Sequence, residues 1–181
     1  MSTRTLHTVH PSPLGDLLLT GSVSPSGLTL GSLSVPGQRG APTVRAEDRD
    51  DGPFAEAHRQ LDAYFAGRRT RFELPLAATG TPFQRAVWQA LDDIPYGTTT
   101  TYGALAARLG VPRAGLRALG RALGANPLLL VRPCHRVIGA DGTMRGYAGG
   151  VEGKRWLLTH EGALQPALPR GAHREALAST P

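Results

Sequence analysis

The chain of 181 residues contains a single cysteine, Cys134, which excludes an internal disulfide bond and a zinc site built from several cysteines. Its sequence has no apolar run close to the roughly 18 residues that a membrane-spanning helix needs. Residues 1–15 also lack the continuous apolar segment of a signal peptide. A protein with one reduced cysteine and neither of these segments is expected in the cytoplasm.

Acidic residues are missing from a long central stretch. No Asp or Glu occurs at positions 94–140, where the basic residues are Arg108, Arg113, Arg117, Arg121, Arg132 and Arg136. Residues 1–78 carry eight basic and eight acidic side chains, whereas residues 79–165 carry ten and five, which is +5 of the total net charge of +6. Such a positive field attracts phosphates and is typical of nucleic-acid binding. Charge alone leaves open an arginine-rich surface without such a partner.

The first part of the chain predicts a small α/β unit. Hydrophobic residues make up 40% of the sequence and charged residues 19%, which is enough for a folded core in one domain or two small ones. Short strand-like runs at 17–20 and 28–30 are followed by a proline- and glycine-broken loop at 37–52. Residues 54–66 have helical spacing of apolar residues, and Gly67 is a plausible stop.

Residues 79–165 predict a helical domain. The sequence TPFQ at 81–84 is a capping box with a threonine N-cap, a proline at the first helical position and a glutamine that can bond back. A second short helix is expected at 101–109, and after a break at 110–112 a third helix ends near Gly124. Two short helices joined by a tight, glycine-containing turn form a helix-turn-helix.

The third helix has an apolar face and an opposite basic face, which consist of Leu116, Leu119 and Leu123, and of Arg113, Arg117 and Arg121. Like charges four residues apart repel by about 0.2–0.5 kcal/mol, so this face gains stability only against an anion. Gly120 and Gly124 lie beside the arginines and would let the helix approach another surface closely. We predict a DNA-binding face; a solvated arginine face is the alternative.

An apolar run at 128–131, expected as a buried strand or extended segment, leads to the only cysteine. Cys134 is followed by His135 and flanked by arginines, and neighbouring cations favour a thiolate, so the sequence predicts a lowered pKa for this thiol. Adjacent residues of an extended chain point in opposite directions, which makes a bridging water between the two side chains plausible. A lone cysteine is also compatible with a small buried apolar residue.

The segment PCHRVIG at 133–139 resembles the active-site motif of the O6-alkylguanine-DNA alkyltransferases, also called methylated-DNA–protein-cysteine methyltransferases. Matching segments occur in the same order at 126–127 (NP), 146–150 (GYAGG), 154–158 (KRWLL) and 160–162 (HEG). The resemblance covers about 81–164 nearly continuously, whereas 1–78 match only in length and in the PLG turn at 13–15. A set of motifs in this order and spacing is highly specific.

We expect an α/β fold: a small N-terminal sheet-plus-helix domain (1–78), a helical winged-helix-like DNA-binding domain (79–165) and a flexible tail (166–181). The resemblance implies a single-turnover repair reaction in which an alkyl group leaves O6 of guanine and stays on Cys134. The implied partner is double-stranded DNA carrying O6-alkylguanine, with activity on O4-alkylthymine left open. The protein would act as a monomer without a cofactor, and without metal because zinc-binding cysteines of some relatives are missing.

The resemblance also implies roles for individual residues. His135 would take the thiol proton through a water, and Glu161 would hold the imidazole. Since Glu161 follows a helix predicted at 151–160, where the helix dipole disfavours a carboxylate, a cationic partner is expected. Tyr102 would donate a hydrogen bond to N3 of the departing purine, and Asn126 would brace the turns of the site. The base would be bound by the carbonyl of Val137 and the amide of Ala148, beside Tyr147.

An alkyl group on O6 of guanine lies inside the duplex stack, so the nucleotide must rotate out. The resemblance implies that Arg117 fills the vacated space with its helix in the minor groove, whereas a helix-turn-helix usually reads the major groove. The chain has one residue more before Arg117 than expected, which leaves the helix start and the role of Arg113 open. Arg121 stands where a small residue is expected and would add a phosphate contact.

Three other functions are weighed against this one. A non-reactive lesion-binding protein of the same family has its acceptor cysteine replaced, whereas Cys134 is present. A cysteine hydrolase using Cys134, His135 and Glu161 would turn over and would not need a basic helix. A transcriptional regulator would leave the motif at 134–137 unexplained. The alkyltransferase is therefore favoured.

Overall fold

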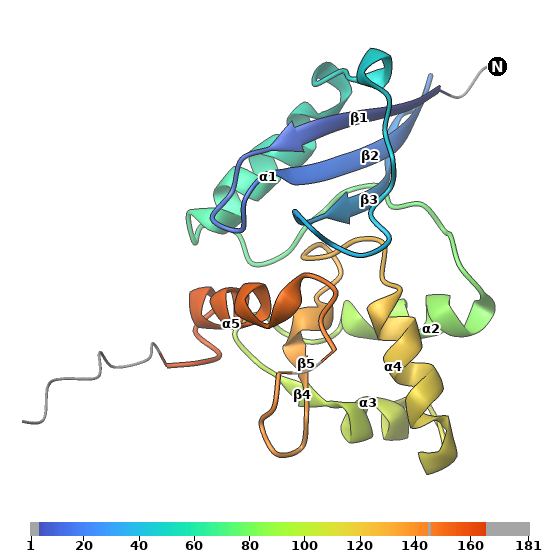
Figure 1. Ribbon diagram of the computed structural model, residues 1–181, viewed down its shortest axis with the longest axis vertical. Helices are drawn as coiled ribbons and strands as arrows, with labels where there is room; N and C mark the ends of the chain where they lie inside the picture. Colours follow the sequence, from blue (N-terminus) through green and yellow to red (C-terminus); the bar gives the residue numbers. More distant parts are fainter. Residues whose placement is uncertain (1–3, 145, 166–181) are drawn as a thin grey trace, which may run out of the picture.

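The computed structural model describes residues 4–144 and 146–165, and the flexible tail predicted at 166–181 lies outside them. Figure 1 shows a part with a sheet and one helix next to a part made mainly of helices. This is the predicted α/β architecture of a sheet-plus-helix unit followed by a helical unit. The sheet is an antiparallel meander in the order β1-β2-β3, with strands β1 (Arg4–His10), β2 (Leu17–Ser24) and β3 (Gly27–Ser34).

One face of this sheet is covered by α1 (Ala55–Phe65), which follows two short 3-10 turns, η1 (Ala46–Asp48) and η2 (Gly52–Phe54). The strand β2 alternates as a half-buried strand should, with Leu17 and Leu19 fully buried. The helix α1 ends at the predicted stop: Gly67 has a φ of 70°, and its N–H donates to the carbonyl of Tyr64 at 2.9 Å.

The strand β1 is not predicted by the sequence pattern because its inward positions include polar side chains. Thr8 is fully buried and donates to Asp51 at 2.6 Å, and His10 lies 2.8 Å from His58, ring nitrogen to ring nitrogen. These polar pairs replace the apolar alternation that identifies a strand in a sequence.

The helical part contains α2 (Pro82–Leu91), α3 (Tyr102–Arg108), α4 (Leu116–Gly124) and α5 (Gly150–His160), together with the short turns η3 (Arg113–Gly115) and η4 (Cys134–Arg136). Its two-residue strands β4 (Thr100–Thr101) and β5 (Val137–Ile138) pair in parallel. No helix in the described part of the chain has the length and apolar character to cross a membrane.

The helix starts predicted from threonines are confirmed. Thr81 Oγ1 accepts from the N–H of Gln84 at 3.2 Å, and Gln84 Oε1 accepts from the N–H of Thr81 at 2.9 Å, which completes the capping box. Thr101 Oγ1 accepts from the N–H of Ala104 at 3.1 Å and starts α3. The helices α2 and α4 pack together, and the indole N–H of Trp88 donates to the carbonyl of Ala122 at 2.8 Å.

The third predicted helix begins later than helical spacing suggests. Regular α-helix starts at Leu116, and Arg113 belongs to the 3-10 turn η3, so the three arginines do not share one continuous helical face. The turn folds back tightly: a Cβ on Gly115 would lie 2.7 Å from the side chain of Val111. The additional residue before Arg117 is thus taken up in a turn that only a glycine permits without a shift.

The apolar run at 128–131 is buried as expected, but it is not a strand. One β-bridge joins Leu128 to Leu33, and the N–H of Leu129 donates to the carbonyl of Leu33 at 3.1 Å. The chain then turns sharply at Leu130, whose φ is 71°. A left-handed conformation is costly for a leucine, so packing and the surrounding hydrogen bonds must hold it. These contacts join the edge of the sheet unit to the helical unit.

The capping box gives a direct stability prediction. Thr81→Ala removes the acceptor for a backbone N–H that no other group in the first turn of α2 satisfies, so the free energy of unfolding should fall by about 1 kcal/mol. Thr81→Ser keeps the hydroxyl and should lose only a small fraction of that. Urea unfolding of the three proteins measures both effects, and equal losses for alanine and serine would show that the cap does not contribute.

Candidate active site

The candidate nucleophile lies on a helical turn, not on the extended chain that the sequence suggested. Cys134 opens η4, is 6% exposed and has a free thiol. Directly after η4, β5 pairs with β4, where Val137 is the partner of Thr100. Because β4 runs straight into α3, this pairing brings the first residue of that helix, Tyr102, to the same side of the molecule as the cysteine.

Asn126 holds the turns that lead to the cysteine. Its Nδ2 donates to the carbonyl of Arg132 at 3.0 Å and to Cys134 Sγ at 3.2 Å, and its Oδ1 accepts from the N–H of Leu128 at 3.1 Å. The side chain is 1% exposed. A single buried amide therefore positions the sulfur and supplies a hydrogen-bond donor to the thiolate when it forms.

The prediction of a lowered thiol pKa is wrong. Burial raises the pKa of Cys134 to about 11, against the smaller opposing effects of the Asn126 hydrogen bond and the positive charge of Lys154. The flanking arginines serve other partners: the Arg132 guanidinium lies 5.6 Å from the ring centre of Trp88, and Arg136 binds a carboxylate. At neutral pH the resting thiol is protonated and needs a base.

The positive charge that acts on Cys134 belongs to Lys154, the only lysine of the sequence. It comes from α5, is 1% exposed and donates through Nζ to the carbonyl of Val137 at 2.5 Å. Burial lowers the pKa of Lys154, opposed by the charge of Cys134. This carbonyl, which is expected to contact the base, thus already accepts a hydrogen bond from Lys154.

His135 has the features of a proton acceptor. Its Nε2 lies 2.8 Å from Glu161 Oε1, and because a carboxylate only accepts, this nitrogen carries the hydrogen. The lone pair of the neutral ring is then on Nδ1, which is buried and has no hydrogen-bond partner among residues 4–144 and 146–165. Burial lowers the pKa of His135, opposed by Glu161, so the ring rests neutral and can take a proton.

Glu161 is the predicted carboxylate at the end of α5, and Arg136 is the cationic partner expected for a carboxylate at that end of a helix. Arg136 donates through Nε to Oε2 at 2.8 Å and through Nη2 to Oε1 at 3.0 Å, a two-point pairing. Tyr64 adds a donor to Oε1 at 2.6 Å. Burial alone would raise the pKa of Glu161, but the hydrogen bonds from His135 and these two residues hold it well below its usual range.

Two tyrosines flank the cysteine, and the glycine-rich loop gives them room. Burial first, and then the charge of Cys134, raise the pKa of half-buried Tyr102 and of buried Tyr147. A Cβ on Gly146, which has a φ of 77°, would lie 2.8 Å from the Tyr102 hydroxyl, and one on Gly149 would lie 2.6 Å from the Tyr147 ring. The structure thus gathers both tyrosines around the thiol, with partly buried Ala148 next in the chain.

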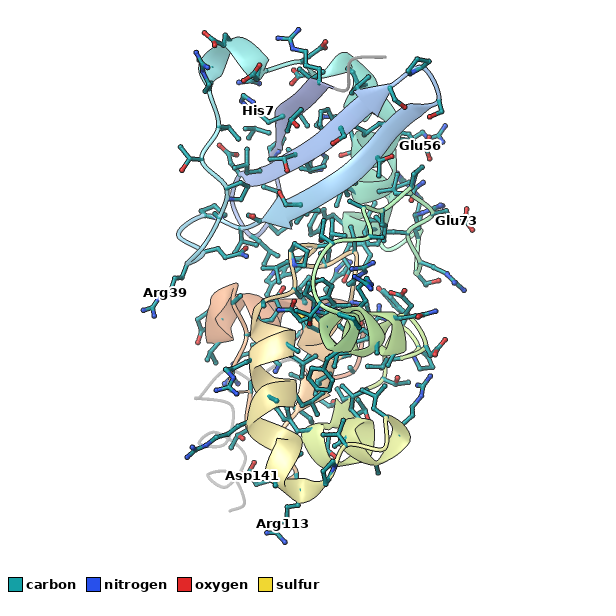
Figure 2. All side chains as sticks on the ribbon, turned by 90° about the vertical axis from the view of Figure 1, so that its right-hand side faces the viewer. His7, Arg39, Glu56, Glu73, Arg113 and Asp141 are labelled. Carbon is teal, nitrogen blue, oxygen red and sulfur yellow. The ribbon has the colours of Figure 1, made fainter. Side chains whose placement is uncertain are left out.

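The candidate DNA-binding residues form a separate surface on η3 and α4. Arg113, Arg117 and Arg121 are exposed, and Figure 2 shows Arg113 at the end of the molecule farthest from the sheet. A Cβ on Gly120 or Gly124 would meet no atom within 4 Å, so no contact among the described residues requires a glycine at either position. The last turn of α4 leads within two residues to Asn126, which connects this surface to the thiol.

Comparison with known proteins decides the family. Residues 5–78 match the family model of the ribonuclease-like domain of 6-O-methylguanine DNA methyltransferase, and residues 82–163 match that of its DNA binding domain. The chain belongs to the 6-O-methylguanine DNA methyltransferase family. The family resemblance and the fold class predicted from the sequence are thereby confirmed.

Close relatives agree with this assignment. A methylated-DNA–protein-cysteine methyltransferase of Methanosarcina acetivorans is 42% identical over 160 residues, which cover 87% of this chain and 98% of the relative. One of Mycobacterium bovis is 46% identical over 156 residues, 86% of this chain and 92% of the relative. The crystal structure of the Mycobacterium tuberculosis O6-methylguanine methyltransferase superposes with a TM-score of 0.76 at 41% identity, covering 91% and 97% of the two chains. A structure of the same organism's protein in complex with DNA has the same TM-score at 43% identity, covering 89% and 95%.

Three contributors to the site of this methyltransferase family member are not predicted by the sequence: Arg136 as the partner of Glu161, Lys154 and Tyr64. Arg136 carries a signal, since it lies inside the motif, but its partner Glu161 follows 25 residues later. Lys154 is marked by being the only lysine. Tyr64 has no signal, because it lies among the apolar positions of α1 and reaches Glu161 over 97 residues of sequence. Among the described residues, no cluster of His, Cys, Asp and Glu side chains could hold a metal ion.

The Arg136–Glu161 pair predicts a large stability effect. Arg136→Met keeps an unbranched apolar stem but leaves a buried carboxylate without its cation, so the free energy of unfolding should fall by about 3–5 kcal/mol. Arg108→Met is the matched control: its ion pair with Asp93 is 49% and 63% exposed and should cost less than about 1 kcal/mol. Guanidinium unfolding at pH 7 compares them, and similar losses would contradict a special weight of the buried pair.

Proposed function

We propose that this protein repairs double-stranded DNA by transferring one alkyl group from O6 of guanine to the sulfur of Cys134, once and without a cofactor. The observation that carries the proposal is the pairing of a protonated thiol with a neutral base. Burial keeps Cys134 protonated and His135 neutral, and His135 Nδ1, which no described residue binds, is the ring nitrogen that can accept a proton. Family membership supplies the reaction class.

In this mechanism the thiol proton passes to His135 Nδ1, through a water as expected from the sequence. The resulting imidazolium is stabilised by Glu161, whose low pKa keeps it charged. The thiolate, stabilised by the Asn126 hydrogen bond and the charge of Lys154, attacks the alkyl carbon. The S–C bond forms as the C–O6 bond breaks, and the purine leaves as an anion that takes up one proton to become guanine. A hydrogen bond from Tyr102 to N3 would stabilise that anion.

A thioether does not release its alkyl group under mild conditions, so the product cysteine is not regenerated. The base would lie against Tyr147, Ala148 and the carbonyl of Val137, as the family resemblance implies. Because O6 of guanine is inside the duplex, the nucleotide must be rotated out of the stack. Arg117 would occupy the space it leaves, and exposed Arg113 and Arg121 would bind phosphates. Gly120 and Gly124, which no contact in the described part of the chain requires, would let α4 approach the DNA closely. The protein would act as a monomer in the cytoplasm.

The first functional prediction concerns stoichiometry. Incubation with duplex DNA containing one O6-methylguanine should add one methyl group to the peptide that contains Cys134, as measured by mass spectrometry of the intact and digested protein. With excess lesion, repair should stop at one lesion per protein molecule. Cys134→Ser, which changes one atom, should bind the DNA with nearly unchanged affinity and repair nothing.

The competing functions predict other outcomes of this experiment. A cysteine hydrolase would continue to turn over in excess substrate, and a lesion-binding protein would bind the DNA without any change in mass. A transcriptional regulator would prefer a DNA sequence over a lesion. Any of these three results would overturn the proposal.

The second functional prediction separates nucleotide rotation from chemistry. Arg117→Ala should slow repair of O6-methylguanine in duplex DNA by about tenfold or more, because the opened duplex loses the side chain that fills it, whereas reaction with the free base O6-benzylguanine should be nearly unchanged. Arg121→Ala and Arg113→Ala are the controls: each should mainly weaken DNA binding and reduce its salt dependence, as expected of a phosphate contact. An equal loss on both substrates for Arg117→Ala would indicate a structural role.

A further inference from the structure

The sheet unit contributes one side chain to the interior of the candidate active site. Tyr64, near the end of α1, is 1% exposed, and its hydroxyl donates to Glu161 Oε1 at 2.6 Å. His135 Nε2 lies 2.8 Å from the same oxygen atom. The tyrosine from the N-terminal unit and the imidazole next to the cysteine therefore share one acceptor.

Tyr64 is held in place on several sides. Its backbone carbonyl accepts a hydrogen bond from His160 Nε2 at 2.8 Å, so α1 is tied to the last residue of α5, directly before Glu161. Its ring packs edge-on against Tyr96 at 6.1 Å and lies 5.3 Å from the ring of Phe72, centre to centre. A side chain fixed this firmly fixes the position of the carboxylate oxygen that it binds.

The hydroxyl acts as a donor. Burial, followed by the charge of Glu161, raises the pKa of Tyr64 far above its ordinary value, so the hydroxyl stays protonated around neutral pH and donates to the carboxylate. A donor on Oε1 withdraws negative charge from the atom that faces the imidazole. It thereby limits how strongly Glu161 favours the protonated form of His135.

We propose that Tyr64 is a positioning residue of the alkyl-transfer site, through which the N-terminal unit sets the orientation and the basicity of His135. This inference rests on the proposed function, because it assigns Tyr64 to the proton relay of that reaction. It gives the sheet unit a part in the chemistry although none of its residues touches the thiol in the proposed mechanism. The contact crosses from α1 to the end of α5, so the relay is complete only when the two units are docked.

The experiment is the pH dependence of the single-turnover rate for wild type, Tyr64→Phe and Tyr96→Phe. With Tyr64→Phe, Glu161 loses one donor and binds the imidazolium more strongly, so His135 stays protonated to higher pH and cannot accept the thiol proton. The midpoint of the rise in rate should move up by about one pH unit, and well below the wild-type midpoint the rate should fall about tenfold, as expected from the loss of one hydrogen bond to a charged group.

Tyr96→Phe is the matched control, because Tyr96 packs against Tyr64 but its hydroxyl donates at 3.5 Å to the carbonyl of His160 and not to Glu161. It should keep the wild-type midpoint. The profiles are recorded with the free base O6-benzylguanine as well as with duplex DNA, which removes DNA binding from the comparison, and thermal melts report folding. A change in melting temperature or in the maximal rate of Tyr64→Phe without a shift of the midpoint would overturn the inference. Failure of wild type to alkylate Cys134 would instead overturn the proposed function.

Discussion

One buried negative charge, the carboxylate of Glu161, links the parts of this molecule. It is 5% exposed and accepts hydrogen bonds from Arg136 and His135 on η4 and from Tyr64 on α1. An uncompensated carboxylate in the interior is so unfavourable that the folded state requires these donors in place. The hydrogen bonds to Glu161 therefore hold together the turn that carries the cysteine, the end of α5 and the docked sheet unit. The same hydrogen bonds orient the candidate base, so the contacts that stabilise the fold also prepare the site for the reaction.

The thiol of Cys134 depends on a base for its activation and not on the positive charge of the neighbouring arginines. A cysteine among arginines suggests activation by charge, but the arginines are committed to Trp88 and Glu161, and burial dominates at the sulfur. The resting nucleophile is thereby protected as a thiol. In the proposed reaction it becomes reactive when His135 takes its proton. A buried, protonated cysteine is less open to oxidation than an exposed thiolate, which suits a residue that can be used once.

Features that depend on neighbouring residues were predictable from the sequence. The capping box at Thr81, the cap at Thr101, the stop at Gly67 and the helix-turn-helix are local patterns, and the structure contains all of them. The family motif could be identified because its segments keep their order and spacing. What failed depends on contacts far apart in the chain: the sign of the thiol pKa shift follows from burial, and the segment at 128–131 turns because Asn126 and the edge of β3 hold it. The start of α4 stayed open because the residues before it form a 3-10 turn, tight against Val111 at Gly115, that has no α-helical period. The polar interior of β1 hid that strand.

The hydrogen bond from the Trp88 indole to the carbonyl of Ala122 places an intrinsic fluorophore against the back of α4. The same ring lies 5.6 Å from the guanidinium of Arg132, two residues before the cysteine. Indole emission depends on the polarity and hydrogen bonding around the ring, so one chromophore reports both on the helix that carries Arg117 and on the segment that carries the sulfur. The other tryptophan, Trp156, is stacked on His160 at 4.9 Å and reports on the junction with α1. The two tryptophans are thus natural fluorescent probes, one next to the helix with the basic surface and one next to the contact between the two units. Changes at both places can be followed in solution without chemical labelling.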